Sequence, residues 1–398
     1  MEPLFHAAPF TGYVYPNETI IAWTALIVVY PYLTGLVAGA FTISSLYQVF
    51  GFRQLRPVAH FALLVSLSCM IVVPLPLLLH LGHPERAFNA MITPHATSAF
   101  AIFSYAAAFY VSLLILETWF VFRPYIVHQA QHRQGVLGSL YRVLSLGSYD
   151  LSEKAMRYDR KWIFALAIIG IPGAHGLHGY VGFVFGSLKS REWWSSDLMP
   201  AIFLFSAIIS GTALVIVLYV LSCKLRKIPI DLSCLKVMAY ALWGFMMFTL
   251  LLEGVEFASL VYRGREGTQV IMEYVQGRLI VPFFILQFGI GSVLPIATIT
   301  FLIWRGINGK ALIAGVTASA LLVLLAVLMM RWNVVIGGQE IAKTGKGLLA
   351  YHPAIFGREG LLAAASVLIA PFVLLLVMIR LFPPWEQEPS AAVPASAR

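Results

Sequence analysis

Long runs of apolar residues alternate with short polar segments along almost the whole chain. A run of about 20 apolar residues is long enough to cross a bilayer as a helix. The pattern leaves no room for a soluble domain and predicts an all-α polytopic membrane protein. Its nine predicted spans are 19–50, 57–82, 96–123, 160–186, 198–224, 232–262, 275–305, 310–331 and 361–382.

The order of these spans predicts two four-helix bundles, 19–186 and 198–331, followed by one extra helix, 361–382. The remaining segments are predicted to be an external N-terminal segment, an external loop that can dock a partner, and a cytoplasmic tail: 1–18, 332–360 and 383–398. The stretches "PLLLHLG" and "TLLLEGVE" align His80 with Glu253, as expected from an internal duplication. Chance matching of leucine-rich helices explains the same similarity.

Composition and charge support the membrane assignment. Hydrophobic residues make up 60% of the chain and charged residues 11%, against about 25% charged in soluble domains. The net charge of +9 comes from Lys and Arg in loops, which is how membrane topology is encoded, so we expect no nucleic-acid partner. Most of these basic residues fall on one side, which predicts an external N-terminus and a cytoplasmic C-terminus.

The polar groups within the spans are the candidate functional residues, because a polar side chain in hydrocarbon needs a partner. The stretch "IIGIPGAHGLHGYVGFVFGS" places His175, His178 and Tyr180 in the outer half of the fourth span. His80 ends the second span, and Tyr32 lies in the outer part of the first. These groups can meet near the outer surface within one bundle.

Three interpretations of this polar group stay open. Histidine exchanges protons near neutral pH and tyrosine donates without carrying charge, as a quinone site requires. Two imidazoles at one depth can instead ligate a b-type haem, for example His80 with His175 or His178. The third interpretation is a glycine-lined helix contact with hydrogen-bonded histidines.

Three acidic residues within spans are candidate stations of a proton path: Glu117, Glu253 and Glu256. A carboxylate is costly in hydrocarbon unless it is paired or protonated. The alternatives are an ion pair with Arg278 or a helix-binding hydrogen bond for Glu253 and Glu256, and snorkelling to the cytoplasmic surface or a pair with Arg123 for Glu117. The three cysteines are scattered, so this chain cannot hold an iron–sulfur cluster through four thiolates.

Several motifs carry a resemblance to a known family. At "LHLGHPERAFNAMITPHATSAF", "HGYVGFVFGSLKSREWWSSDLMPAIFLFSAIISG" and "RWNVVIGGQ" the chain resembles the NrfD/PsrC family of integral membrane subunits. It is most similar to the long HybB-like and DsrP-like members, DsrP above all. The resemblance implies two four-helix bundles, no haem or metal in this chain, and an exchangeable menaquinone or ubiquinone near the outer face of the first bundle.

The resemblance also implies roles for individual residues. Tyr180 matches the tyrosine of the family's "Y-x-G" stretch, which is associated with quinone binding. His80 stands where many members have Asp in "L-D-L-G-x-P", which keeps a titratable group with a different charge. His178 and Tyr32 are assigned by proximity to these two rather than by motif.

The sequence thus leads to a functional hypothesis. The chain is expected to exchange electrons and protons between quinol and a periplasmic ferredoxin-like iron–sulfur subunit, within a Dsr-like complex of sulfur metabolism. Its expected location is the bacterial or archaeal cytoplasmic membrane. It would be the quinone-reactive part of an oxidoreductase rather than an enzyme alone. The alternatives are a HybB-type hydrogenase subunit, a proton-linked transporter or a scaffolding anchor.

Overall fold

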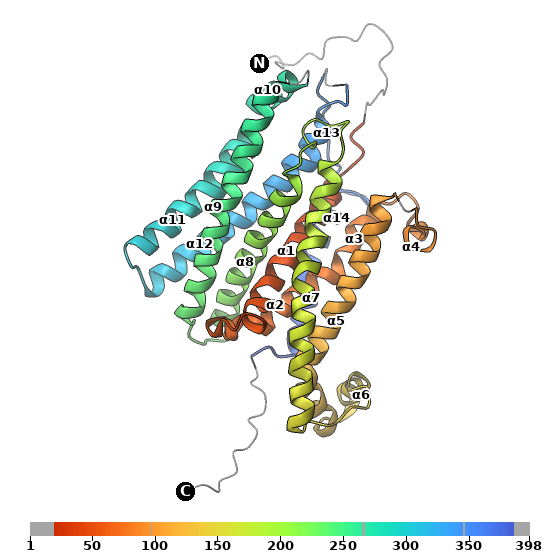
Figure 1. The fold of residues 1–398 in the computed structure, drawn as a ribbon, viewed down its shortest axis with the longest axis vertical. Coiled ribbons are helices and arrows are strands. Elements are labelled where there is room, and N and C mark those ends of the chain that lie inside the picture. Colours follow the sequence, from red (N-terminus) through yellow and green to blue (C-terminus); the bar gives the residue numbers. More distant parts are fainter. Residues whose placement is uncertain (1–19, 96, 265–266, 345–346, 386–398) are drawn as a thin grey trace.

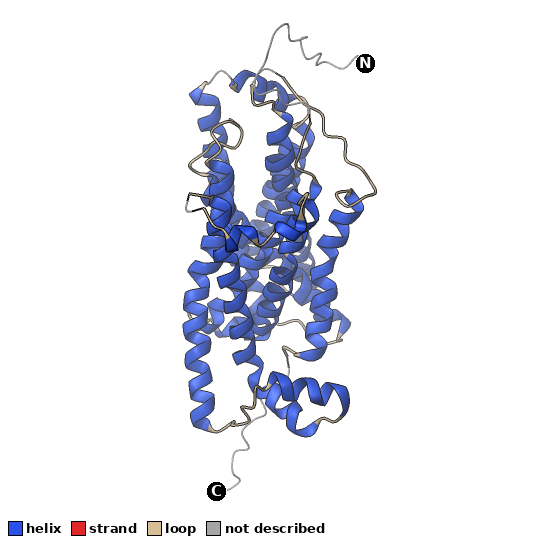
Figure 2. Ribbon diagram, turned by 90° about the vertical axis from the view of Figure 1, so that its right-hand side faces the viewer, coloured by secondary structure: helices blue, strands red, loops and turns tan. Residues whose placement is uncertain are grey.

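The computed structural model describes residues 20–385 apart from 96, 265–266 and 345–346. The predicted segment 1–18 and most of the predicted tail therefore lie outside the described residues. Within the described part, nine helical spans are long and apolar enough to cross a membrane, which confirms the all-α polytopic fold (Figures 1 and 2). Six spans are single helices: α1 (Ala25–Gln48), α5 (Ala99–His132), α7 (Glu153–Gly186), α8 (Met199–Leu225), α9 (Leu232–Arg263) and α14 (Leu361–Leu381).

The other three spans are composite. They are α2 (Arg56–Val72) with α3 (Pro74–His80), the π-helix η3 (Ile280–Val293) with α11 (Leu294–Trp304), and α12 (Gly309–Trp332) with the π-helix η4 (Asn333–Gly337) and α13 (Gly338–Glu340). Pro74 starts α3 and Pro295 lies in the first turn of α11, where the missing N–H costs nothing. The short helices are η1 (Arg53–Leu55), η2 (Pro84–Arg86), α4 (Asn89–Ile92), α6 (Gly135–Leu144) and α10 (Thr268–Gln276).

Helix α1 lies at the centre of the molecule and joins the two halves. It packs against α2, α3 and α7 on one side and against α8 and α12 on the other, while α14 covers α2 and α1. The crossing with α8 is close because two glycines face each other: a Cβ on Gly39 would lie 2.6 Å from Cα of Gly211. Such small residues let backbones approach without hydrophobic driving force between helices.

Helices α5 and α7 are longer than the bilayer requires. Each has 34 residues, or about 51 Å at 1.5 Å per residue. They run to the end of the molecule that carries α6, the lower end in Figure 1, whereas α10 and α13 mark the upper end. The predicted ends at 123 and 160 are wrong because Arg123 is buried and ion-paired with Asp159 at 2.6 Å, which lets both helices continue.

The predicted external loop 332–360 is also wrong over 332–340. These residues continue α12 as η4 and α13, and Asn333, Val335 and Gln339 are buried. The Gln339 side chain accepts from the backbone N–H of Trp23 at 2.8 Å and donates to the Trp23 carbonyl at 3.2 Å. The apolar "VVI" run is thereby packed next to the start of α1, and the non-helical connection begins at Ile341.

Candidate functional site

A buried polar cluster lies where α1, α7, α8 and α12 meet. Arg331 on α12 is fully buried, and its Nη2 lies 3.0 Å from Nε2 of His178 on α7 and 2.6 Å from Oγ of Ser206 on α8. Nδ1 of His178 lies 3.1 Å from Oγ1 of Thr34 on α1. The Arg331 guanidinium also stacks over the Phe203 ring at 3.9 Å. We call Thr34, His178, Ser206 and Arg331 the junction cluster.

The partners of His178 fix its tautomer. A guanidinium only donates, so Nε2 of His178 must accept the hydrogen bond from Arg331. Nδ1 then carries the proton and donates to Thr34, whose own hydroxyl donates to the backbone carbonyls of Tyr30 and Pro31. His178 is therefore neutral in this arrangement, and both of its ring nitrogens are occupied by protein groups.

Tyr32 and Tyr180 face different helices. The Tyr32 hydroxyl donates to the carbonyl of Leu324 on α12 at 3.2 Å, so it lies on the junction side of α1. The Tyr180 hydroxyl donates to the carbonyl of Ala99 at the start of α5 at 3.1 Å. Its ring stacks on Phe103 with centroids 6.4 Å apart. Tyr180 thus lies on the α5 side of α7, away from His178, as their separation of about 160° around a helix requires.

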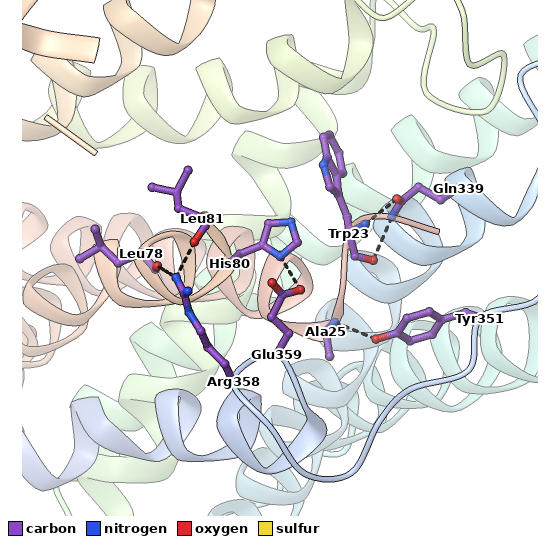
Figure 3. Close-up of polar contacts among 9 residues, drawn as sticks. All are labelled: Trp23, Ala25, Leu78, His80, Leu81, Gln339, Tyr351, Arg358 and Glu359. Carbon is purple, nitrogen blue, oxygen red and sulfur yellow. Dashed lines mark hydrogen bonds and ion pairs between the residues drawn. The ribbon is translucent and has the colours of Figure 1, made fainter. Parts of the chain in front are cut away.

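His80 lies at the upper end, on α3. Its Nδ1 is 3.1 Å from Oε2 of Glu359, a carboxylate whose side chain is 41% exposed (Figure 3). The neighbouring Arg358 donates to the carbonyls of Leu78 at 2.8 Å and Leu81 at 2.5 Å. The segment before α14 therefore caps the end of α3, and His80 is linked to a carboxylate open to water.

The same segment fixes the start of α1. The Tyr351 hydroxyl accepts from the backbone N–H of Ala25 at 3.1 Å, beside the Trp23–Gln339 pair in Figure 3. Burial raises the pKa of the Tyr351 hydroxyl, so this group stays a neutral acceptor. The upper end of α1 is thus held by residues more than 300 positions away in the sequence.

His175 has two local partners. Its Nδ1 lies 2.7 Å from the carbonyl oxygen of Ile171, and its Nε2 lies 3.2 Å from Oγ1 of Thr42 on α1. Its Nδ1 therefore donates to the backbone, and its Nε2 lies beside the Thr42 hydroxyl, which donates to the Ala38 carbonyl at 2.8 Å. A packing hydrogen bond accounts for this residue. The three histidines of the haem alternative thus have separate protein partners, which are Thr42 for His175, Arg331 for His178 and Glu359 for His80.

The acidic residues of the spans lie in two separate places. Oε2 of Glu253 on α9 accepts from Nε2 of Gln287 on η3 at 3.1 Å, the helix-binding hydrogen bond that the sequence left open. Arg278 instead lies near Glu340, at 3.9 Å. Glu117 on α5 is fully buried, with both carboxyl oxygens unpartnered, because Arg123 pairs with Asp159.

The structure therefore brings together some predicted site residues and separates others. Tyr32 and His178 lie on the same junction, whereas Tyr180 lies on the α5 side and His80 contacts Glu359. Arg331 was missed as a partner, since it was placed at the membrane edge. The available signal was an ionisable residue at the end of an apolar run, which marks function or a buried partner.

Comparisons with known proteins agree with this architecture. The chain is 30% identical to the C subunit of selenate reductase from Mesobacillus selenatarsenatis, over 91% of this chain and 86% of that protein. It is 26% identical to a putative dimethyl sulfoxide reductase membrane subunit of Halobacterium salinarum, covering 58% and 50%. It is 25% identical to an Hdr-like menaquinol oxidoreductase integral membrane subunit of Archaeoglobus fulgidus, covering 57% and 49%.

A sequence profile described as "Polysulphide reductase, NrfD" matches residues 15–342, which include eight of the nine spans and the whole junction cluster. The match ends directly after α13, so it leaves out the connection to α14 and α14 itself. The chain therefore belongs to the NrfD polysulphide reductase family.

Proposed function

We propose that this chain is the quinone-reactive membrane subunit of a multisubunit oxidoreductase, exchanging electrons and protons between menaquinol or ubiquinol and an iron–sulfur partner. Family membership and relatives named as membrane subunits of a reductase and of a menaquinol oxidoreductase support the subunit role. The observation that carries the site is Tyr180, a half-buried hydroxyl beside an aromatic wall in the first bundle.

The residues around Tyr180 fit a quinone head group. A quinone, when bound, accepts two electrons and two protons at its ring oxygens, so it needs hydrogen-bond donors and an apolar slot. Among the described residues the Tyr180 hydroxyl donates to the Ala99 carbonyl, and rotation about its C–O bond can re-aim the hydrogen. Phe103 and Phe183, at centroid distances of 6.4 and 5.5 Å, supply the apolar wall.

His178 and Tyr32 take a secondary place in this proposal. Both rings are already hydrogen-bonded within the junction, so they would bind a ligand only after exchanging a protein partner. His178 with Arg331 instead holds α7 against α12, which positions the helix that carries Tyr180. Tyr180 is therefore the proposed ligand-binding donor, and the junction cluster is its support.

His80 is the proposed proton relay. Its hydrogen bond to Glu359 links the upper end of α3 to an exposed carboxylate, so a proton received by the imidazole has a route to water. The iron–sulfur partner, which we propose to be ferredoxin-like and periplasmic, would dock at this same upper end. The other subunits would complete a Dsr-like or hydrogenase-like assembly.

The proposed orientation places the upper end outside and the lower end in the cytoplasm of a bacterial or archaeal cell. Basic residues cluster around α6 and the start of α7 at the lower end: Arg133, Arg142, Lys154, Arg157 and Arg160. Positive charge favours the cytoplasmic side of short loops. Helix α14 runs toward this end, so the C-terminus would be cytoplasmic.

Glu117, Glu253 and Glu256 are the proposed proton stations if electron transfer is coupled to charge movement. Both carboxyl oxygens of Glu117 are buried without a hydrogen-bond partner among the described residues, and so is Oε2 of Glu256. Unpaired carboxyl groups in hydrocarbon are costly and usually functional. Proton transfer through these carboxyl groups would be lost on replacement by glutamine, because glutamine has nearly the same shape but no ionisable proton.

A DsrP-like role in sulfur metabolism stays a prediction. One relative, which the chain matches over 86% of that relative's length, is named for the reduction of selenate and not of a sulfur compound. Sulfite-reductase genes beside this one would support the sulfur role, and hydrogenase genes would support the HybB-type alternative.

Replacement of Tyr180 and His80 tests the proposed function. In the purified complex, Tyr180→Phe and His80→Gln are each expected to lower quinol-dependent electron transfer by about 10²-fold. Tyr105→Phe is the matched control, because the Tyr105 hydroxyl also donates to a backbone carbonyl, that of Met91. His83→Gln is the control for His80, since His83 is an exposed histidine beside Glu85. Normal rates in both test variants would refute the site.

A further inference from the structure

A cavity lies between α8, α9, η3 and η4. Its volume is about 70 Å³, and its wall includes Trp193, Phe257 and Phe283. The polar side chains that line it are Glu253 and Glu256 of α9, Gln287 of η3 and Asn333 of η4. Neither Tyr180 nor His80 lines this cavity, so it is separate from the proposed quinone site.

Two π-helices, η3 and η4, border this cavity. Phe283 and Gln287 belong to η3, and Asn333 and Val334 belong to η4. A π-turn widens a helix and leaves carbonyls and side chains displaced from their α-helical positions, and it occurs frequently at functional sites. Because two such segments line one cavity, we interpret the cavity as a functional feature of the fold rather than a packing defect.

The hydrogen bonds around the cavity fix the orientation of both amides. Nδ2 of Asn333 donates to the carbonyl of Pro282 at 3.2 Å, which can only accept, and to Oε1 of Gln287 at 2.8 Å. Nε2 of Gln287 then donates to Glu253. Both amide nitrogens of this pair are turned toward protein acceptors. Oδ1 of Asn333 is left over, and this residue is only 1% exposed.

The cavity is therefore rich in acceptors and lacks donors. Oδ1 of Asn333 and Oε2 of Glu256 are buried with no hydrogen-bond partner in the part of the chain that the structure describes, and Glu253 adds a second carboxyl group. Among the side chains that line the cavity, the remaining donor is the indole of Trp193, which donates to the carbonyl of Asn333 at 3.1 Å. Unsatisfied buried acceptors are costly, so the missing partner must be a donor or a cation.

The volume and the charge select among such partners. A cavity of about 150 Å³ holds benzene, so 70 Å³ is too small for a quinone ring but holds a few waters at about 10–15 Å³ each. Arg331 lies close enough to attract Glu253, although its hydrogen bonds go to His178 and Ser206. With both carboxyl groups ionised, two carboxylates and one guanidinium leave one negative charge, which a monovalent cation balances.

We infer that this cavity binds a hydrated monovalent cation, Na⁺ or hydronium, between Glu253, Glu256 and Asn333. Oxygen ligands from carboxylates, an amide carbonyl and water suit a hard cation. The inference deepens the proton-station role given to Glu253 and Glu256 in the proposed function. Binding is an equilibrium property, however, and does not require that quinol reacts at Tyr180.

Thermal unfolding of the purified full-length protein in detergent tests the inference. At constant ionic strength, replacing choline chloride by NaCl is expected to raise the Tm of the wild type and of Glu256→Asp, because a ligand that binds only the folded state stabilises it. Glu256→Gln is expected to lose this response. Glu117→Gln, a buried carboxyl in the other bundle, is the matched control and keeps it.

The hydronium arm adds Glu253→Gln to these variants and is measured without Na⁺. Infrared difference spectra between acid and neutral pH are expected to show a carboxyl signal that is altered in both Glu253→Gln and Glu256→Gln, as two groups sharing one proton require. The titratable groups that line the cavity are Glu253 and Glu256, and the charged group nearest to them is Arg331, which does not line the cavity but attracts Glu253. A Na⁺ effect with this signal assigns Na⁺ in exchange with protons, and the signal alone assigns a proton, held at the two carboxyl groups, as the bound cation.

Two results would overturn the inference. One is that Glu256→Gln changes neither the response to Na⁺ nor the carboxyl signal. The other is that a water-soluble hydroquinone raises the Tm of the wild type but not of Glu256→Gln, which would make the cavity an aromatic-ligand site. Failure of the proposed function would give a different result. Tyr180→Phe would then leave the rate of electron transfer unchanged, and the response to the cation would remain.

Discussion

Gly182 and Gly176 allow a sharp test of what the glycines of α7 do. A Cβ added at Gly182 would lie 2.7 Å from the carbonyl oxygen of Met199 and 2.8 Å from Cα of Pro200, both backbone atoms of α8. A Cβ at Gly176 meets nothing within 4 Å. Carbon atoms pack at about 3.5 Å, so Gly182→Ala must push α7 away from α8 by about 0.7 Å.

The expected cost follows from this displacement. Overpacking costs about 1–3 kcal/mol, and replacing Gly by Ala in a helix returns roughly 0.8–1 kcal/mol at either position. Gly182→Ala is thus expected to destabilise by up to about 2 kcal/mol, and Gly176→Ala to be neutral or stabilising. His178 lies one turn from Gly182, so the same shift stretches its 3.0 Å contact with Arg331.

Reversible unfolding in mixed detergent micelles measures the difference between the two variants. It should equal the overpacking cost alone, because the helix-propensity gain is common to both. Equal stability of Gly182→Ala and Gly176→Ala would refute the packing role of Gly182. Weaker quinone binding in Gly176→Ala at unchanged stability would show instead that a flat ligand lies against that glycine.

Three further predictions follow from individual contacts. Asp159→Asn leaves Arg123 buried without its carboxylate and should lower the free energy of unfolding by about 3–5 kcal/mol; a loss below about 1 kcal/mol would contradict a buried pair. Hydrogen bonds from the backbone and side chain of Ser152 lower the pKa of Asp150. Its contribution to stability is present above the unfolded-state pKa and is lost as pH falls through the lower folded-state value, so Asp150→Ala should remove that acid-dependent part from unfolding curves measured against pH. Nitrogen-15 NMR of His178 should show a protonated Nδ1 and a bare Nε2, and the opposite tautomer would exclude the Arg331 bond.

Hydropathy alone was enough to predict the membrane spans, because the bilayer requires each span to be long and apolar whichever helices pack against it. It failed where a buried charge found a distant partner. Arg123, past which α5 continues, is paired with Asp159, 36 residues later, and Gln339 in the buried segment 333–340 is hydrogen-bonded to Trp23. In both places a local sequence window contains only half of the interaction.

The candidate site divides in the same way. The sequence pointed to His80, Tyr32, His178 and Tyr180 by residue type, depth and motif, and it placed all four at one end of one bundle. The sequence could not predict their hydrogen-bond partners, because these belong to other helices or connections: Glu359, Leu324, Arg331 and Ala99. A helix rotation of tens of degrees decides which partner a side chain meets, and only packing fixes that rotation.

The sequence by itself thus determined that the chain is a membrane protein of one family with nine predicted spans and polar groups at defined depths. The tertiary structure decided that His178 is held by Arg331 across 153 residues, that Tyr180 faces α5, and that Glu253, Glu256 and Asn333 share one cavity. The physical reason is that span formation is set by local transfer free energy, whereas polar pairing in hydrocarbon is set by which helices meet.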